Sequence, residues 1–577
     1  MLRRCLPATI RRALDDLPRS LDETYERILL SIGEERWDYA WRLFQCLAVS
    51  IRPLRVDELA EILAMQFDVG ALPSYDVKFR PVDSEEAVLA TCSSLLMIVN
   101  VDGSQVVQFS HFSVKEYLTS ERLTKAGKEL SRYHIIPRFA HALLSEASLG
   151  VLLSLDDPVD ENSVKNSPLS IYAARHWVDH ARFEDVASTI EDAMDLLFDS
   201  TKSHFATWVW IYDIDYPFRD IMFTEHPTPP ANVPLYYATL CGFQGLVERL
   251  ATACPQGVNA RGGYYLHAAL AKGNLDMARL LLEHGVDVTA SDNGPLLPLH
   301  WESRRGHGDA VELLLKYHTD IDIQDENGQT SLTFASQYGQ PDVVHVLLQS
   351  GATVDTRDHN GWTPLMLASR YGRPDIVPLL LQSGAALDSR DDSGWTPLMF
   401  ASGYGHPDIA RLLIQYGAAV DSQGDDGWTP LMLASETGRD GVVHLLLENG
   451  ATVDFHHNDG WTALMPASQN GHLDVVRLLL QNGSAVDSPD EDGRTSLMSA
   501  SRAGHPDIVR LLLQNGAAVD AYDKDGSTSL KSASASGHLC IVRLLLQSGA
   551  RVDSPERSYS TPRSGTLWFG ISRAPVT

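Results

Sequence analysis

A period of 33 residues runs through the C-terminal half of the chain and limits what it can fold into. Seven glycines follow one another at this spacing without a slip: Gly328, Gly361, Gly394, Gly427, Gly460, Gly493 and Gly526. A column of aspartates keeps the same spacing: Asp322, Asp355, Asp388, Asp421, Asp454, Asp487, Asp520 and Asp553. A fixed period of this length predicts a stack of similar small units rather than one globular core.

Each period has the local signals of a turn followed by two antiparallel helices. In the unit that begins at Gly361, Thr363 suits a helix N-cap and Pro364 suits the first helical turn. Gly372 is placed to end this helix in a left-handed conformation, and Pro374 is placed to begin the second helix. Because helices this short are not stable alone in water, each must bury its apolar face against neighbouring units.

The repeated motifs read T-P-L-M-L-A-S at 363–369 and D-I-V-P-L-L-L-Q-S-G-A at 375–385. In length and motif the repeat resembles the ankyrin family. That resemblance implies an α-solenoid that binds other proteins, with about ten units between residues 231 and 555. The sequence departs from the family where Met366 and its counterparts replace the histidine that usually follows T-P-L. Methionine is a flexible gap-filler, so this departure affects local rigidity rather than the fold.

Two columns of aromatic side chains recur at equivalent positions of consecutive units. They are Trp362, Trp395, Trp428 and Trp461 in the turn, and Tyr338, Tyr371 and Tyr404 at the end of the first helix. One interpretation is that each tryptophan braces its turn on the next unit. The other is a protein-binding surface, because Trp and Tyr are among the commonest interface anchors. A half-buried ring can do both, so these seven residues are the candidates for contacts with a partner.

Polar side chains form two further columns. The histidine column consists of His307, His406, His472, His505 and His538. Its members lie one repeat apart, which is too far to share a metal ion whose ligand bonds are about 2 Å long. We therefore expect the histidines to pack and to form hydrogen bonds between the two helices. The aspartates are expected to form local hydrogen bonds with the main chain of their own turn.

The N-terminal half lacks the period and reads as helices with one hairpin. Helices are expected within 11–50 and over 52–64, 85–96 and 111–123. Short β-type runs at 97–100 and 105–110 flank Val101-Asp102-Gly103-Ser104, which predicts a hairpin. Three helices followed by a hairpin is the order of a winged helix, and 52–64 is the expected recognition helix.

We therefore expect a mostly α-helical protein in five parts. They are a helical segment at 1–50, a winged-helix-like domain at 51–125, a helical bridging region at 126–230, the ankyrin repeats at 231–555 and a divergent or disordered tail at 556–577. Four prolines between 227 and 234 mark the start of the repeats.

Three motifs of the N-terminal half are L-P-R-S-L-D-E-T-Y-E-R-I-L at 17–29, R-P-L-R-V-D-E-L-A-E-I-L at 52–63 and F-S-H-F-S-V-K-E-Y-L at 109–118. This region resembles the part that follows the nucleotide-binding domain in fungal NACHT–ankyrin proteins, which are relatives of NOD-like receptors. In that family a winged-helix histidine contacts the β-phosphate of the nucleotide, and by motif position it would be His111. The chain has no G-x-x-x-x-G-K-[ST] motif, so no cofactor is expected. His111 would contact a nucleotide only if another chain supplied the NTPase domain.

The charge of the chain narrows the range of partners. A net charge of −28 argues against nucleic acid and anionic membranes, which would need clustered Lys and Arg. Residues 328–555 carry 26 acidic against 14 basic side chains, a balance of −12, which would attract a protein with a basic face. No apolar run reaches 18 residues, so no membrane-spanning helix is expected. The six cysteines form no C-x-x-C pair, which favours a reducing compartment, the cytoplasm or the nucleus.

These observations predict a scaffold for protein–protein interactions, as a truncated or NTPase-less receptor-like signalling protein. No hydrolase motif such as G-x-S-x-G or H-E-x-x-H is visible, so we expect no enzyme activity. The alternative is one part of a nucleotide-driven NACHT switch whose NTPase domain lies outside this chain.

Overall fold

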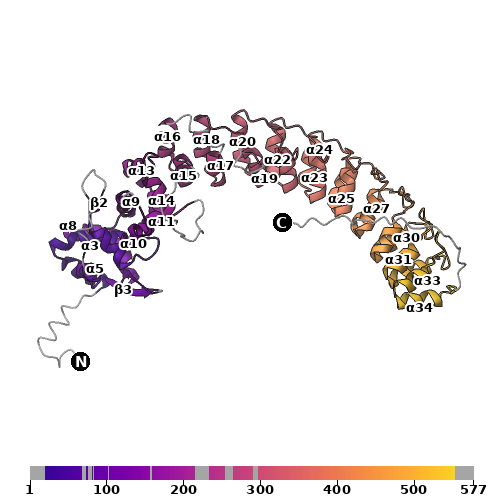
Figure 1. Ribbon diagram of the computed structural model, residues 1–577, viewed down its shortest axis with the longest axis horizontal. Helices are drawn as coiled ribbons and strands as arrows, with labels where there is room; N and C mark the ends of the chain where they lie inside the picture. The colour runs from indigo at the N-terminus through magenta and orange to yellow at the C-terminus, as the bar shows by residue number, and fades with distance from the viewer. Residues whose placement is uncertain are drawn as a thin grey trace, which may run out of the picture. The chain divides into compact units, whose positions relative to one another are not determined.

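The computed structural model describes residues 20–67, 73–75, 81, 83–101, 103–155, 159–214, 233–253, 264–289 and 296–552. The chain divides into two compact units, Met1–Asp292 and Asn293–Thr577, and short helices dominate both (Figure 1). The tail expected at 556–577 and the prolines expected to mark the start of the repeats before residue 231 lie outside the described residues.

The first unit opens with a winged-helix arrangement. Its elements are α2 (Leu21–Leu30), η2 (Glu34–Arg36), α3 (Trp37–Val49), α4 (Val56–Leu63), β1 (Met65–Gln66), β2 (Ser74–Tyr75), α5 (Ser84–Cys92), β3 (Leu96–Val101), β4 (Ser104–Phe109), α6 (Phe112–Leu118), α7 (Glu121–Lys125) and α8 (Lys128–Ser131). Strands β3 and β4 form the predicted hairpin, with Val99 opposite Val106. The segment before α4 pairs with β4, because the Val107 N–H donates to the Leu54 carbonyl at 2.9 Å.

The prediction that 52–64 is the recognition helix is wrong. The helix that directly precedes the hairpin is α5, and the second helix of a helix-turn-helix pair takes the recognition position. The sequence misled because α4 and α5 are separated by some twenty residues that include the small β1–β2 ribbon, instead of a tight turn. The first turn of α5 is acidic, with Glu85 and Glu86, and the Asp83 side chain caps it.

Buried carboxylates join α4 to the helices that follow. Glu58 forms an ion pair with Arg52 at 2.6 Å. Glu61, also fully buried, accepts hydrogen bonds from the Ser167 hydroxyl at 2.8 Å and the Leu169 N–H at 2.6 Å. A buried charge is costly unless it is paired and hydrogen-bonded, and the Glu61 contacts fix the winged helix against the bridging region.

The bridging region is helical, and aromatic side chains fill its core. Its helices are α9 (Pro137–Ser154), α10 (Glu161–Asn166), α11 (Ser170–Ala181), α12 (Val186–Thr189), α13 (Glu191–Leu197) and α14 (His204–Ile211). Trp177 packs edge-on against Trp208 with ring centres 5.4 Å apart. Nδ1 of His141 and Nδ1 of His180 are hydrogen-bonded at 2.8 Å. Burial, helped by the neighbouring His141 and His176, lowers the pKa of His180 to about 3.

Among the described residues, two helix pairs complete the first unit, and eight more form the second. The first are α15 (Pro234–Cys241) with α16 (Gln244–Ala253) and α17 (Tyr264–Ala271) with α18 (Leu275–Glu283). The second unit holds α19 (Pro298–Arg305), α20 (Gly308–Lys316), α21 (Ser331–Tyr338), α22 (Pro341–Gln349), α23 (Pro364–Tyr371), α24 (Val377–Gln382), α25 (Pro397–Tyr404), α26 (Pro407–Gln415), α27 (Pro430–Glu436), α28 (Asp440–Glu448), α29 (Leu464–Asn470), α30 (Leu473–Gln481), α31 (Ser496–Ala503), α32 (Pro506–Gln514), α33 (Ser529–Ala535) and α34 (Leu539–Gln547).

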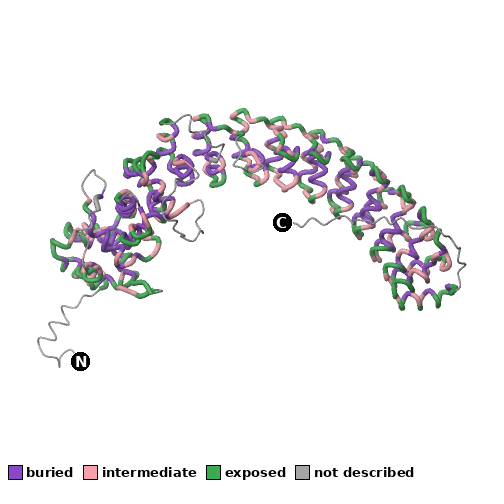
Figure 2. The backbone as a smooth tube through the Cα atoms, viewed as in Figure 1, coloured by how far each residue is buried: buried purple, intermediate pink, exposed green. Residues whose placement is uncertain are grey.

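Within the second unit the pairs stack in two layers. Helices α19, α23 and α25 lie on the inner side of its curve, and α20, α22 and α24 on the outer side (Figure 1). Buried residues follow the faces on which neighbouring helices meet (Figure 2). The Thr363 hydroxyl caps α23 at the Met366 N–H, and Gly372 ends that helix at φ +71°, both as predicted.

Two helices begin later than their local signals predict, and proline is the reason in each. Helix α24 begins at Val377 rather than Pro374, because Pro378 has no N–H to donate to the Pro374 carbonyl. Helix α29 begins at Leu464, one residue later than its counterparts in neighbouring repeats. There Pro466 stands where the N–H of the equivalent residue, such as Leu433 in α27, donates to the carbonyl of the capping threonine.

Two columns of side chains join each repeat to its neighbour. His406, His472, His505 and His538 each donate from Nε2 to a main-chain carbonyl of the preceding repeat at 2.9 to 3.2 Å. The column was expected to form hydrogen bonds at the turn between the two helices, and the structure instead directs these bonds to the preceding repeat. His307 differs, because its Nδ1 lies 2.6 Å from Glu302 Oε2 in its own repeat.

The aspartate column does not hold its own turn, which corrects the expectation from sequence. Asp388 accepts a hydrogen bond from the Ala419 N–H of the next repeat at 3.1 Å, and its counterparts do the same. The turn is held by a second column three positions later, where Asp358 accepts from the N–H groups of Asn360 and Trp362. Both columns have the same period, so spacing alone could not separate their roles.

Candidate protein-binding surface

The two aromatic columns occupy different places on each repeat. The tryptophans stand in the turn directly before the threonine that precedes the first helix, and all four are half-buried. Each tyrosine is the last residue of a first helix, at the ends of α21, α23 and α25. Tyr371 and Tyr404 are 41% and 42% exposed, which leaves their rings available to a partner.

Trp362 and Trp428 contact the next repeat, and Trp395 contacts its own repeat. Trp362 donates its indole N–H to Asp391 at 3.0 Å and meets Phe400 edge-on at 5.7 Å. Trp395 lies 5.4 Å from the same Phe400 ring. Trp428 packs edge-on against His457 at 5.5 Å between ring centres. Because all four tryptophans remain partly exposed, bracing and partner binding are compatible.

Arg370 gathers three of the seven aromatic residues into one cluster. Its guanidinium carbon lies 4.4 Å from the ring centre of Trp362, 4.8 Å from that of Tyr404 and 5.7 Å from that of Tyr371. Cations over aromatic faces at these distances are attracted by the ring quadrupole. We call Trp362, Arg370, Tyr371 and Tyr404 the aromatic–arginine cluster.

A weaker version of this arrangement occurs two repeats earlier, where Arg304 lies 4.5 Å from the ring centre of Tyr338. The arginines were missed in the sequence because their column is not uniform. Successive repeats carry Arg304, Gln337, Arg370, Gly403 and Glu436 at this position, so no repeated residue type announces it. Trp461 has no ring or cation partner of this kind among the described residues.

Carboxylates surround the aromatic surface at the turns. Asp391 accepts hydrogen bonds from Ser393, from Trp395 and from the Trp362 indole, and it is therefore fixed. Asp425 and Asp426, one repeat later, are exposed. Burial, with Asp426 nearby, raises the pKa of Glu436 above its usual range. The surface is thus lined by aromatic rings and acidic groups.

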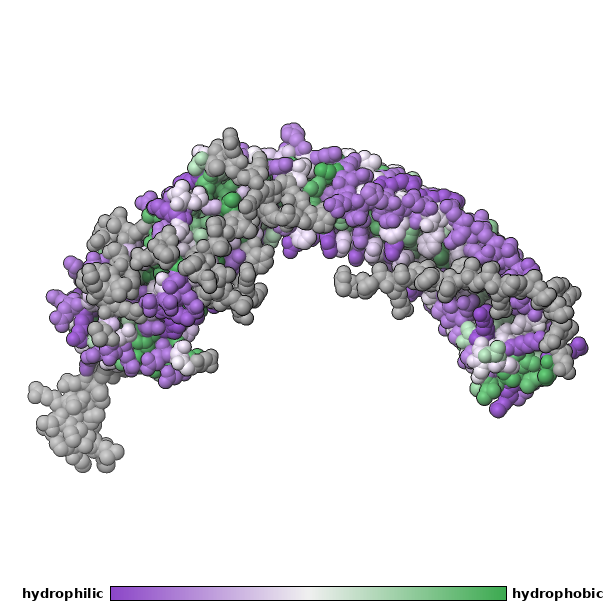
Figure 3. Space-filling view, in the orientation of Figure 1, coloured by the Kyte–Doolittle hydropathy of each residue, from purple (hydrophilic) through white to green (hydrophobic). Residues whose placement is uncertain are grey.

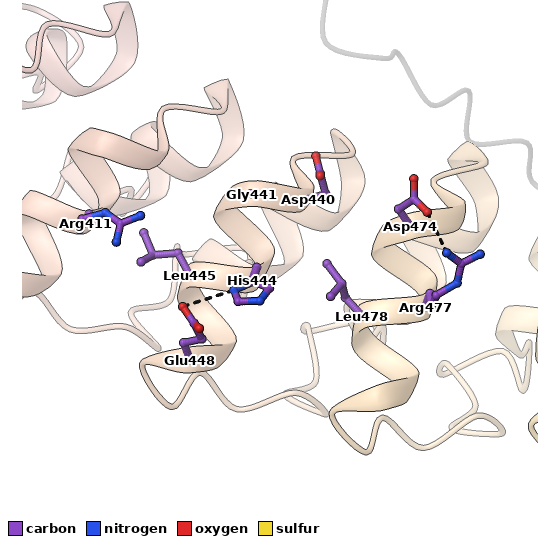
Figure 4. A pocket seen from close by; sticks show the side chains of 9 residues that line it. All are labelled: Arg411, Asp440, Gly441, His444, Leu445, Glu448, Asp474, Arg477 and Leu478. Atoms are coloured by element: carbon purple, nitrogen blue, oxygen red, sulfur yellow. Dashed lines mark hydrogen bonds and ion pairs between the residues drawn. The ribbon is translucent and has the colours of Figure 1, made fainter.

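A separate shallow groove of about 450 Å³ crosses the outer helices α26, α28 and α30 (Figure 4). Two contacts between its polar side chains lie within single helices, His444 with Glu448 and Arg477 with Asp474, each at 3.3 Å. Because the groove lies on the second helices, it does not include the aromatic columns.

The structure places His111 at the junction between the hairpin and α6. It is the N-cap of that helix, where Nδ1 accepts from the Ser113 N–H at 3.2 Å and lies 2.6 Å from its hydroxyl. The ring packs against Phe112 at 4.3 Å and is otherwise exposed. Its present role is therefore to begin α6.

Comparison with known families identifies both parts of the chain. Residues 299–391, 383–457, 417–490, 449–523 and 483–556 match the model described as ankyrin repeats (3 copies). Residues 266–315 match ankyrin repeats (many copies), and 26–128 match the winged helix domain of GPI inositol-deacylase. The chain is therefore mostly helical, with a winged helix domain near its N-terminus and ankyrin repeats in its C-terminal half, which confirms the predicted fold class.

One similar protein is the azaphilone pigments biosynthesis cluster protein L of Monascus ruber, 31% identical over 294 residues. The match covers 48% of this chain and 61% of the relative, so the chain spans less than two thirds of the relative's length. A fungal relative agrees with the resemblance to fungal proteins. The finer resemblance to NACHT–ankyrin proteins stays a prediction.

Among the helices of the described ranges, none combines the length and the apolar composition needed to cross a lipid bilayer.

Proposed function

We propose that this protein is a scaffold for protein–protein interactions and that the aromatic–arginine cluster is the centre of its binding surface. The observation that carries the proposal is the packing of Arg370 among three partly exposed rings. Tyr, Trp and Arg are the residues most enriched at interface hot spots. Stacking holds these side chains in place before a partner arrives, which lowers the entropic cost of binding.

The partner is a protein with a basic face. Residues 328–555 carry a balance of −12, and the exposed Asp392, Asp425 and Asp426 lie at the turns beside the aromatic columns. Such a surface attracts and orients a basic partner during encounter. Nucleic acid is a poor partner, because α5 in the recognition position begins with Glu85 and Glu86.

We further propose that the protein is non-enzymatic and acts in the cytoplasm as an NTPase-less, receptor-like signalling protein. Support comes from the winged helix domain that precedes the ankyrin repeats. The parts proposed are those expected from the sequence, with the winged helix at 51–125, the bridging helices at 126–230 and the repeats at 231–555.

The alternative is one part of a NACHT switch whose NTPase domain lies outside this chain, and the exposed ring of His111 favours it. Protein complexes isolated with the full chain would then contain ADP. The variant His111→Ala would lose the nucleotide and keep the associated proteins. Complexes without nucleotide would contradict this alternative and leave the scaffold proposal intact.

The scaffold proposal is tested by removing the exposed rings of the cluster. The double variant Tyr371→Ala/Tyr404→Ala should weaken binding to a captured partner by about 2 kcal/mol or more. The matched control is Tyr416→Ala, because Tyr416 is 46% exposed at the end of an outer helix. The proposal would be overturned if the unmodified chain, the double variant and the Tyr416→Ala control bound the partner with equal affinity.

A further inference from the structure

The ring of Trp362 is covered on two sides by its own protein. The Arg370 guanidinium lies over its face at 4.4 Å, and the Asp391 carboxylate accepts its indole N–H at 3.0 Å. The chain therefore contains one filled cation slot, in which an aromatic face, a guanidinium and a carboxylate meet. The following repeat has the same main-chain arrangement around its own tryptophan, Trp395.

One repeat later, both covering side chains are replaced by glycine. Gly403 stands in the position of Arg370, and Gly424 stands in the position of Asp391. No cation lies over Trp395, and its indole N–H has no hydrogen-bond partner among the described residues. The equivalent slot is empty.

Backbone conformation does not require either glycine. Neither residue has a positive φ. Gly403 also lies inside α25, where glycine weakens a helix relative to any ordinary side chain. A Cβ at Gly403 would make only an ordinary contact, 3.7 Å from the Leu433 Cβ. A side chain could therefore occupy the space at Gly403, and the sequence leaves that position open.

Acidic groups stand around the open slot. An atom at the Cβ position of Gly424 would lie 2.8 Å from Asp426 Oδ1, 3.1 Å from Trp395 Cδ1 and 3.3 Å from Met399 Cε. This edge of the indole is therefore closely packed, and the Asp426 carboxylate is near it. Glu436 follows Leu433 by three residues on α27 and therefore lies on the same helix face, which packs beside Gly403. Its carboxylate has no ion-pair partner among the described residues.

We propose that the slot formed by Trp395, Gly403, Gly424, Asp426 and Glu436 binds the guanidinium of an arginine from a basic segment of a partner protein. The planar guanidinium stacks on Trp395 as Arg370 stacks on Trp362, and the two carboxylates accept its N–H donors. Arginine fits better than lysine, because its guanidinium is less strongly hydrated and stacks on rings. The proposal rests on the proposed protein-binding function and names the partner chemistry of that surface.

The test uses the full chain labelled with 5-fluorotryptophan, and the variant Trp395→Phe assigns the Trp395 signal. The probe is a short glycine–serine peptide with one central arginine, compared with the same peptide carrying lysine or glutamine. We expect the arginine peptide to move the Trp395 signal, with a dissociation constant at least threefold lower than the lysine peptide. The glutamine peptide should leave the signal in place. Equal affinity of the arginine and lysine peptides would overturn the assignment of a guanidinium.

Two substitutions exchange the filled and empty slots. Gly403→Arg should supply the slot with its own guanidinium and weaken peptide binding at least tenfold. Gly441→Arg is the control, because Gly441 is another glycine within a helix, and it is exposed with nothing within 4 Å of its Cβ position. Conversely, Arg370→Gly should uncover Trp362 and make its signal respond to the arginine peptide.

Wild-type affinity in Gly403→Arg, or a silent Trp362 in Arg370→Gly with unchanged helical circular dichroism, would overturn the proposal. Failure of the broader function is distinguishable. It would appear as partner binding that is insensitive to Tyr371→Ala/Tyr404→Ala, whatever the arginine peptide does.

Discussion

Asp421 shows how a single residue links two repeats. Its carboxylate accepts from the Thr452 N–H at 2.9 Å and from the Thr452 hydroxyl at 2.6 Å. Hydrogen bonds to a charged group contribute about 1.5–3 kcal/mol each, and the loss of one partner leaves the other unsatisfied. We expect Asp421→Ala to lower the free energy of unfolding of the second unit by about 2 kcal/mol in urea.

The control for this prediction is Asp408→Ala, which removes an exposed aspartate from the first turn of α26. That residue interacts with the helix dipole, an effect of about 0.3–1 kcal/mol. If both substitutions lower the free energy of unfolding equally, the contact between repeats contributes nothing beyond the effect of removing a charge.

The histidine pair of the first unit predicts a response to acid. The unfolded pKa of His180 is about 6.5, whereas burial lowers it to about 3 in the folded protein. Between these values only the unfolded chain binds the proton, so the stabilising contribution is complete above pH 6.5 and falls as the pH drops toward 3. We expect the first unit to lose up to about 1.4 kcal/mol per pH unit in this window.

Urea unfolding of the full chain, followed by tryptophan fluorescence at pH 7 and pH 5, measures this loss. His180→Gln keeps a polar side chain and removes the titration, so its transition should depend less on pH. An equal dependence in the variant would show that other groups cause the acid sensitivity.

At the scale of the element, α29, which is the first helix of its repeat, lacks one main-chain hydrogen bond that its counterparts form. In α23 the Leu367 N–H donates to the Thr363 carbonyl at 3.0 Å, and Pro466 cannot make the equivalent bond. The hydroxyl of Thr462 is buried and has no hydrogen-bond partner. We expect Pro466→Leu to stabilise the second unit by about 1–2 kcal/mol through the regained bond and apolar contact.

The matched variant is Pro364→Leu, because Pro364 occupies the first position of α23, where proline is favourable. It should leave stability unchanged or lower it. A neutral or destabilising Pro466→Leu, measured by urea unfolding of the full chain, would mean that Pro466 is accommodated without cost.

The sequence predicts elements better than it predicts contacts between them. The ends of α23 were predictable because Thr363 and Gly372 act on main-chain atoms within a few residues of themselves. The partner of Asp388 was not predictable, because it lies 31 residues away. The aspartates that bond to the next repeat also have the same period as those that hold their own turn. For the candidate surface, the rings were predictable as a repeated column, whereas Arg370 was not, since its counterparts include Gln337, Gly403 and Glu436.

At the scale of the whole molecule, the last described helix pair should be the least protected part of the second unit. Leu539 is 78% exposed and Leu546 is 45% exposed on α34. Hydrophobic side chains gather at this end in the space-filling view (Figure 3). A terminal repeat has one neighbour instead of two, so its amides open more easily.

Hydrogen exchange of the full chain tests this expectation. Amides of α33 and α34 should exchange at least tenfold faster than those of α27 and α28. Equal protection in the two pairs would show that the end of the array is covered.

The bonds between repeats also determine how the second unit would respond to tension. Each histidine and aspartate link joins residues only 31 to 36 positions apart, so a pulling force meets them one repeat at a time. When one repeat gives way, 33 residues extend by about 110 Å and the next repeat bears the load. The unit would therefore lengthen in equal steps and rewind in the same steps, as an elastic tether for whatever protein it holds.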